Sequence, residues 1–112
     1  MKEQGNALVA ERDYSAAVAK YAAAMSSGGR CKIGDEVPLR LNRALCYLKL
    51  AAVKKGGLYA RAELYDRASA DATAMMPFAL GGMQAKARFR LAQALYGCAI
   101  DNLSRTSRQV LL

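Results

Sequence analysis

Helix-sized segments separated by glycine and proline are the feature that most constrains the fold of this chain. The breaks are the run Ser26–Gly29, the pair Gly56–Gly57, and Pro77. Between them, Ala, Leu, Lys, Arg and Met dominate and β-branched residues are few, which favours helix over strand. We therefore predict an all-α fold of short helices joined as hairpins.

The segments between the breaks predict six helices. Asp13 is suited to cap the second helix, because a short carboxylate side chain accepts a hydrogen bond from the first free backbone amides. Asp35 and Glu36 ahead of Pro38 mark the start of the third, since acids favour the positive end of a helix and proline is tolerated in the first turn. The expected helices are about 2–11, 13–25, 35–54, 62–76, 82–98 and 101–112.

Charge and cysteine content narrow the classes of function. The chain has 112 residues, the length of one domain, and a formal net charge of +8, which suggests an acidic partner. It contains no histidine, and Cys31, Cys46 and Cys98 lack the spacing of a metal site. Cys46 lies in the apolar run 45–48, where we expect a buried, reduced thiol. We expect no metal, no cofactor and no enzymatic activity.

Targeting signals are the next constraint. The sequence has no secretory leader and no run of 18 apolar residues. We therefore expect a cytoplasmic protein that has no membrane partner.

Small and aromatic residues recur at helix-hairpin spacing. Gly5 is followed twelve residues later by Ala17, and then by Tyr21 and Ala24. Small residues at the first two positions would let two helices approach closely, and the aromatic ring would fill the space between them. This spacing resembles the tetratricopeptide repeat, a helix–turn–helix unit of about 34 residues.

Two further units follow the first one. In the second, the small residues Ala44 and Ala68 are 24 residues apart, so about twelve extra residues are expected in or around its turn. In the third, Ala92 takes the first small position and Ser104 the second. The resemblance implies a single domain, 1–112, of three repeats (about 1–29, 37–77 and 80–112) stacked as a right-handed α-solenoid, with an extended turn in the second repeat.

Five polar residues resemble the clamp of one tetratricopeptide subclass. That subclass has a Lys and an Asn four residues apart on the first helix, an Asn on the third, and Lys-x-x-x-Arg on the fifth. Members occur in co-chaperones and bind the Glu-Glu-Val-Asp tails of cytosolic heat-shock chaperones of the seventy- or ninety-kilodalton class. The residues that match are Lys2, Asn6, Asn42, Lys86 and Arg90.

Elementary chemistry agrees with the role that this resemblance implies. Residues four apart share one face of a helix, so Lys86 and Arg90 project together. Lys and Arg form charge-assisted hydrogen bonds with carboxylates, and Asn amides donate without adding repulsion between like charges. The resemblance implies that Lys2, Asn6 and Asn42 hold the terminal carboxylate, while Lys86 and Arg90 meet the aspartate side chain or the residues before it.

Other readings remain open at this point. Clusters such as Lys54–Lys55 would suit a nucleic-acid-binding array, but basic residues do not alternate with aromatic ones, so nucleic acid is not favoured. A scaffold that docks partner helices through apolar faces is another reading. Lys49 and Leu48 could border the groove, although a solvated lysine and a core leucine are the simpler expectation.

No capping helix follows the sixth helix, so we expect further chain or self-association through this helix to cover Leu103 and 110–112.

Overall fold

The computed structural model describes residues 2–26, 32–53 and 58–111, with side chains described except at 2, 58–59, 102 and 104–111. These residues form an all-α architecture and contain no strand. The five helices are α1 (Lys2–Ala10), α2 (Tyr14–Ser26), α3 (Ile33–Val53), α4 (Leu58–Met75) and α5 (Gly82–Leu111).

The α1–α2 hairpin has the packing that its sequence predicts. Ala17 and Tyr21 are buried, and a Cβ atom built on Gly5 would lie 2.5 Å from a ring carbon of Tyr21. Only glycine fits so close an approach, because real Cβ contacts are not found at that distance. Asp13 caps α2 as predicted, since its Oδ1 accepts a hydrogen bond of 3.3 Å from the Ala16 amide.

Helices α3 and α4 form the second hairpin. The predicted small residues, Ala44 and Ala68, are both fully buried in one apolar cluster. On the same pair of helices, the buried carboxylate of Asp71 accepts two hydrogen bonds from Arg43, of 2.8 and 2.7 Å. The extra residues of this unit mostly lengthen the two helices, because only residues 54–57 of the expected turn lie outside the described residues.

The predicted break after residue 98 is wrong. Residues 82–111 form one continuous helix, so the sixth helix and the hairpin of the third repeat do not form. Nothing between Cys98 and Asp101 stops a helix, and the one glycine nearby has a packing role. A Cβ atom on Gly97 would lie 2.5 Å from the Tyr65 ring, so this glycine lets α5 approach α4 closely.

The small position predicted at Ala92 is also wrong. Ala92 is exposed, whereas Ala94, two residues later, is buried against the cluster that contains Ala44 and Ala68. Positions two residues apart on a helix point about 200° apart around its axis. The buried face of α5 is therefore almost opposite to the predicted one. Ser104, the expected partner of Ala92, has a side chain outside the described residues.

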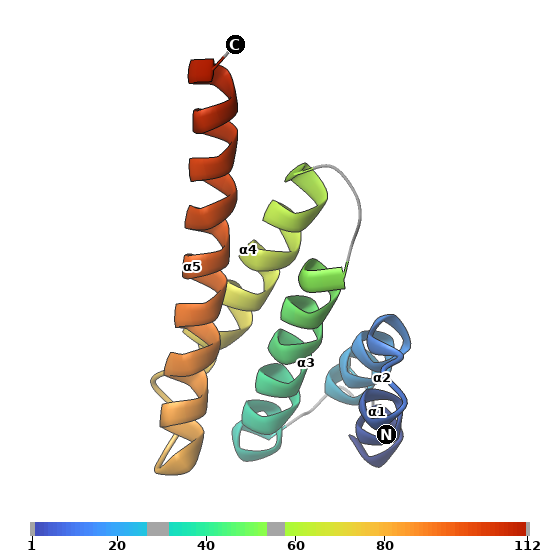
Figure 1. Cartoon of the computed structure of the whole chain (residues 1–112). Helices are drawn as coiled ribbons and strands as arrows, with labels where there is room; N and C mark the ends of the chain where they lie inside the picture. Colours follow the sequence, from blue (N-terminus) through green and yellow to red (C-terminus); the bar gives the residue numbers. More distant parts are fainter. Residues whose placement is uncertain (1, 27–31, 54–57, 112) are drawn as a thin grey trace.

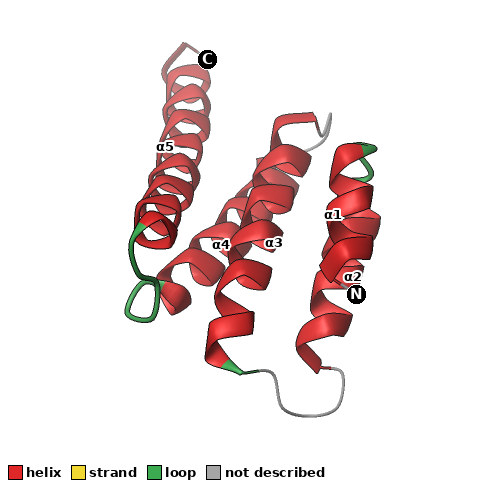
Figure 2. Cartoon of the chain, turned by 90° about the horizontal axis from the view of Figure 1, so that it is seen from below, coloured by secondary structure: helices red, strands yellow, loops and turns green. Residues whose placement is uncertain are grey.

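The helices pack in chain order, as Figure 1 shows, and α3 also contacts α5. Helix α3 therefore lies centrally, in contact with α2, α4 and α5, and the view in Figure 2 shows it between α1 and α4. The molecule is elongated, with extents of 53 × 28 × 23 Å, and the C-terminal end of α5 projects beyond α4 (Figure 1). Among the helices that the structure describes, none is long and apolar enough to cross a bilayer.

Candidate functional site

Four of the five predicted site residues lie on three different helices, of which the central one, α3, packs against α5 and shares the neighbour α2 with α1. Asn6 is on α1, Asn42 is on α3, and Lys86 and Arg90 are on α5. We refer to these four as the donor cluster. The side chain of Lys2, the fifth predicted residue, lies outside the described residues.

The two asparagines contact each other across the space between α1 and α3. The amide nitrogen Nδ2 of Asn42 donates a hydrogen bond of 3.4 Å to Oδ1 of Asn6. The hydroxyl of Tyr21, from α2, donates to the same Oδ1 at 2.5 Å. Because the oxygen of Asn6 already accepts two donors, its amide nitrogen is the end left to donate to a ligand.

Tyr21 is the buried anchor of this asparagine pair. Its side chain is 1% exposed, and its ring lies against Gly5, one residue before Asn6. Burial raises the pKa of the Tyr21 phenol, the Cys46 thiol raises it further, and the nearby Asn42 amide lowers it. A phenol whose pKa is raised stays protonated near neutral pH, so it can act as the donor to Asn6.

Arg90 brings an uncompensated guanidinium to the cluster. Its side chain is half-buried, and its Nε is fully buried without a hydrogen-bond partner. Burial lowers the pKa of Arg90, and the Cys46 thiol opposes this effect. Among the described residues, Arg90 forms no ion pair. A partly desolvated cation that lacks an anion binds a carboxylate more strongly than a fully hydrated cation does.

Cys46 connects Arg90 to the asparagines. It follows Asn42 by one helical turn on α3 and is fully buried, as the sequence predicted. Burial raises the pKa of the Cys46 thiol to about 11, and the charge of Arg90 partly opposes the increase. The thiol is therefore neutral at physiological pH and supplies no counter-charge to Arg90.

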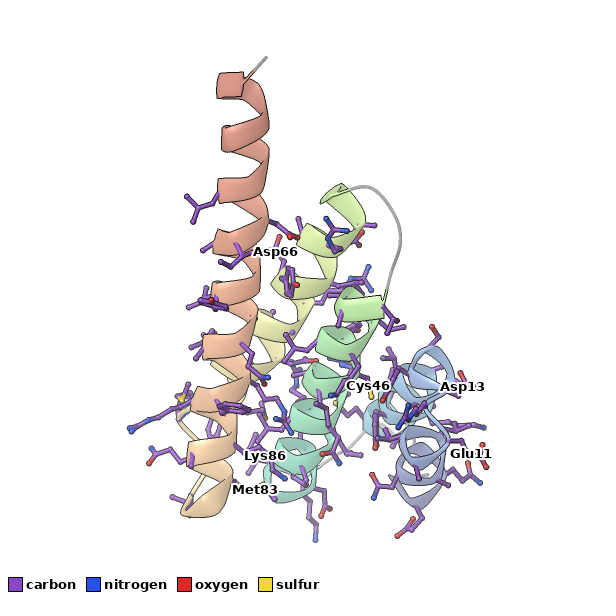
Figure 3. All side chains as sticks on the ribbon, viewed as in Figure 1. Glu11, Asp13, Cys46, Asp66, Met83 and Lys86 are labelled. Carbon is purple, nitrogen blue, oxygen red and sulfur yellow. The ribbon has the colours of Figure 1, made fainter. Side chains whose placement is uncertain are left out.

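Lys86 precedes Arg90 by one turn of α5 and is half-buried. In the view of Figure 3 its side chain lies between the ribbons of α5 and α3. The site therefore combines two cations with two amides and contains no acid of its own. The described ion pairs engage other basic residues: Arg40, Arg43, Arg61 and Arg67.

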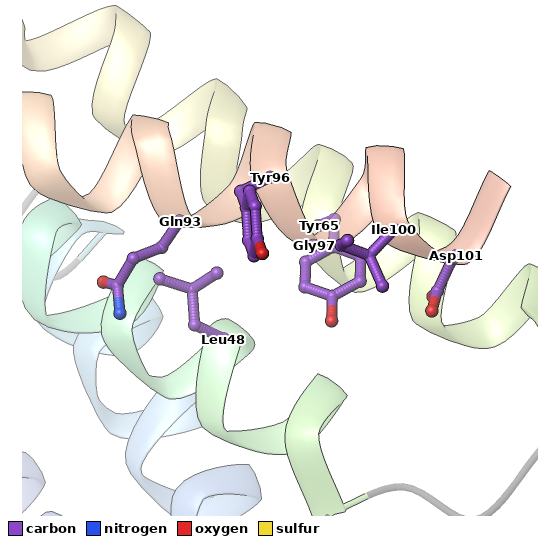
Figure 4. Close-up of a pocket in the computed structure, with 7 residues that line it drawn as sticks. All are labelled: Leu48, Tyr65, Gln93, Tyr96, Gly97, Ile100 and Asp101. Carbon is purple, nitrogen blue, oxygen red and sulfur yellow. The ribbon is translucent and has the colours of Figure 1, made fainter. Parts of the chain in front are cut away.

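A cavity of about 360 Å³, lined by residues of α3, α4 and α5, begins about one turn beyond Arg90 on α5 (Figure 4). Gln93, which lines it, is three residues beyond Arg90, and Leu48 lines it from α3. Leu48 is buried, as expected for a core residue, but it also borders this cavity. The other lining residues are Tyr65, Tyr96, Gly97, Ile100 and Asp101.

Sequence reasoning missed two residues of this site. The sequence predicts only a packing role for Tyr21. It predicts a buried thiol for Cys46 but not that the thiol lies near Arg90. The position of Tyr21 beside Gly5 was a usable signal for the first, because the residue after Gly5 is Asn6. No sequence signal indicates the proximity of Cys46 to Arg90, which are 44 residues apart.

The arrangement offers hydrogen-bond donors and positive charge, which suit a carboxylate or another small anion. Within the described part of the chain, no group of three or more His, Cys, Asp or Glu residues is placed to hold a metal ion. Comparisons with protein-family models, with curated proteins and with solved structures found no match. The functional assignment therefore depends on the geometry of the donor cluster and on the motif resemblance.

Proposed function

We propose that this chain is an adaptor domain whose donor cluster binds the free C-terminal carboxylate of an acidic peptide. The single observation that carries the proposal is the half-buried guanidinium of Arg90, whose Nε has no partner. A buried donor without an acceptor is unfavourable, and a ligand carboxylate would supply the missing negative charge.

The two asparagines support the same ligand. Oδ1 of Asn6 accepts hydrogen bonds from Tyr21 and from Asn42. The amide nitrogen of Asn6 and the second amide hydrogen of Asn42 remain available to donate to a ligand. Amides donate to a carboxylate without repelling the neighbouring cations. In the proposed complex, Lys2, Asn6 and Asn42 hold the main-chain carboxylate, and Lys86 and Arg90 meet the carboxylate of the last side chain.

The cavity on α5 suits the residue before the terminal acid. Leu48, Tyr65 and Ile100 supply apolar lining, and the lining begins at Gln93, about one turn beyond Arg90. An aliphatic side chain such as valine would be removed from water there, which contributes to binding. Together these features match a tail of the Glu-Glu-Val-Asp type.

The motif resemblance extends the proposal to a biological role. We propose that α1–α2 and α3–α4 are two tetratricopeptide-type units and that α5 supplies the first helix of a third. A co-chaperone module that binds the tails of cytoplasmic heat-shock chaperones is the role that this class implies. A binding module, and not an enzyme, is the proposal that the donor cluster supports.

The affinity should be modest. Each charge-assisted hydrogen bond contributes about 1.5–3 kcal/mol, but ordering a flexible tail offsets much of the sum. We expect a dissociation constant on the order of micromolar. Added salt should weaken binding, because part of the attraction is between charges near the surface.

A nucleic-acid-binding array is the alternative that the net charge suggests. The observed ion pairs argue against a continuous basic surface: Arg43 binds Asp71, Arg61 binds Asp101 and Arg67 binds Glu63. These three arginines are thus paired within the molecule and are less available to phosphates. An oligonucleotide that binds and is not displaced by the acidic peptide would indicate a separate nucleic-acid site.

The proposal is tested by fluorescence anisotropy with a labelled free-acid peptide ending in Glu-Glu-Val-Asp. We expect Arg90→Gln to weaken binding about tenfold or more, because it removes a charged donor. Arg88→Gln is the matched control: Arg88 is exposed, is on the same helix and is outside the cluster. Equal effects of the two substitutions would mean that binding follows overall charge, and the proposal would be wrong.

A further inference from the structure

A second cavity lies at the far end of α3 from the donor cluster. Its volume is about 490 Å³, and it is bordered by the turn between α1 and α2 and by the last turns of α3. Its lining contains no acid and includes two cations, Arg12 and Lys49. The remaining lining residues are Tyr14, Ala52 and Val53.

Both cations are available for a ligand. Arg12 and Lys49 are exposed, and neither side chain forms an ion pair or hydrogen bond with a described residue. Two acids flank Arg12 in sequence, Glu11 and Asp13, but neither lines the cavity. Asp13 is also engaged, because its carboxylate caps α2. The lining of the cavity therefore carries two positive charges and no carboxylate.

The backbone at Arg12 adds an independent observation. Its φ angle is 62°, in the left-handed region where glycine is usual. The amide of Asp13 bonds to the carbonyl of Leu8 and that of Arg12 to Val9, which is the Schellman pattern that ends α1. A glycine would satisfy this turn with less strain, so the backbone does not account for an arginine here. The side chain instead adds a cation beside Lys49.

Helix geometry sets the distance between this cavity and the donor cluster. Lys49 follows Asn42 by seven residues on α3, which is two turns, so both lie on one side of the helix about 10.5 Å apart along its axis. Arg12 follows Asn6 by six residues along the adjacent α1 and its turn. An extended peptide advances about 3.3 Å per residue, so three residues span this distance.

From this spacing we propose that Arg12 and Lys49 bind the side-chain carboxylate of an acidic residue three positions before the peptide's C-terminal residue. The proposal depends on the proposed function, since it assumes that the terminal carboxylate occupies the donor cluster. Two cations on one carboxylate give charge-assisted hydrogen bonds from both sides. The ligand class is thus narrowed to C-terminal peptides that carry two acids at this separation.

The test compares two labelled free-acid peptides, one ending in Glu-Ala-Ala-Asp and one ending in Gln-Ala-Ala-Asp. We expect the unmodified protein to bind the first about three- to fivefold more tightly, the range of a partly exposed ion pair.

Lys49→Gln should reduce this preference for the Glu peptide. Arg12→Gly should also reduce it, because glycine keeps the left-handed turn and removes only the cation. In a double-mutant cycle, the effects of Lys49→Gln and of the Glu-to-Gln change in the peptide should not add.

Controls separate this proposal from the function on which it depends. Lys20→Gln removes an exposed lysine of α2 that does not line the cavity, and it should leave the preference for Glu unchanged. If Glu and Gln peptides bind equally while a C-terminal amide binds poorly, the second site is wrong and the donor cluster stands. If Lys49→Gln and Lys20→Gln alter the preference equally, the second site is also wrong. If the amide binds as tightly as the acid, the proposed function itself fails.

Discussion

The hydroxyl of Tyr21 donates a hydrogen bond of 2.5 Å to Oδ1 of Asn6, across the α1–α2 hairpin. The ring can reach this position because Gly5 has no Cβ atom to obstruct it. The same glycine–tyrosine contact that closes the hairpin therefore also orients a residue of the donor cluster. Packing and the proposed binding site are therefore coupled at this point in the fold.

This relationship predicts the effect of removing one oxygen atom. Tyr21→Phe keeps the ring packed against Gly5 but removes the shorter of the two hydrogen bonds to Oδ1 of Asn6, so the amide is held less firmly toward a ligand. We expect peptide affinity to fall severalfold and the free energy of unfolding to fall by only about 1 kcal/mol. Anisotropy and urea denaturation measure the two effects. Unchanged affinity would show that the hydroxyl does not position Asn6.

Gly97 should tolerate no side chain. A Cβ atom there meets the Tyr65 ring at 2.5 Å, so Gly97→Ala should lower the free energy of unfolding by about 1–3 kcal/mol. Gly34, in the first turn of α3, has open space around it, and Gly34→Ala should be neutral or stabilise by up to about 1 kcal/mol. Denaturation followed by circular dichroism compares them. Similar effects at both positions would contradict the close packing of α5 on α4.

Cys46 should make stability decrease at alkaline pH. Burial raises the pKa of its thiol from 9.0 to about 11, with the charge of Arg90 in partial opposition. Between about pH 9 and pH 11 the unfolded chain releases this proton and the folded chain retains it, so the free energy of unfolding falls as pH rises. The slope is at most about 1.4 kcal/mol per pH unit.

The variant Cys46→Ala isolates the contribution of this thiol. Its free energy of unfolding should decrease less steeply with pH than that of the unmodified chain, as measured by urea titrations across this range. Parallel pH dependences would mean that the thiol has the same pKa in the folded and unfolded chains.

An exposed stripe on α5 is a second candidate surface for self-association; of the residues expected to need cover it includes Leu103, while the side chains of 110–112 lie outside the described residues. Phe89, Gln93, Tyr96, Ile100 and Leu103 follow one another at intervals of four and three residues, the spacing of a helix that pairs with another helix. Four of them are large apolar residues that are 42–70% exposed. Gln93, Tyr96 and Ile100 also line the cavity proposed for the peptide, so a second copy and the peptide should compete. Without peptide, sedimentation velocity should detect dimers, and Ile100→Asp should shift them to monomers.

Leu95 provides the control for that measurement. It is 58% exposed on α5 but lies outside the stripe, so Leu95→Asp should leave the dimer intact. If both substitutions dissociate the dimer, the contact is not specific to the stripe. If the unmodified chain is monomeric at every concentration, the stripe does not pair with a second copy.

The first four helices could be predicted because local chemistry determines them. Asp13 marks the start of α2, and Gly5 with Ala17 and Tyr21 predicts how α1 and α2 pack. The continuity of α5 could not be predicted in this way, because Gly97 indicates a helix break or a close contact equally well from sequence. The distinction depends on Tyr65, which is 32 residues earlier in the chain.

The donor cluster was predicted as a set of residue types, but its energetics were not. Lys2, Asn6, Asn42, Lys86 and Arg90 are identified by their resemblance to the clamp motif. That Asn6 accepts from Tyr21, or that Nε of Arg90 lacks a partner, depends on which side chains other helices bring nearby. Sequence periodicity carries little information about such contacts, because burial and pairing are properties of the assembled fold.

The central claim is that the donor cluster recognises a terminal carboxylate, and one pair of peptides tests it most directly. Two labelled peptides ending in Glu-Glu-Val-Asp, one a free acid and one a C-terminal amide, differ only in the group that Asn6 and Asn42 are proposed to bind. Measured by anisotropy at one salt concentration, the free acid should bind about tenfold or more tightly than the amide. Equal binding of the acid and the amide would contradict the claim.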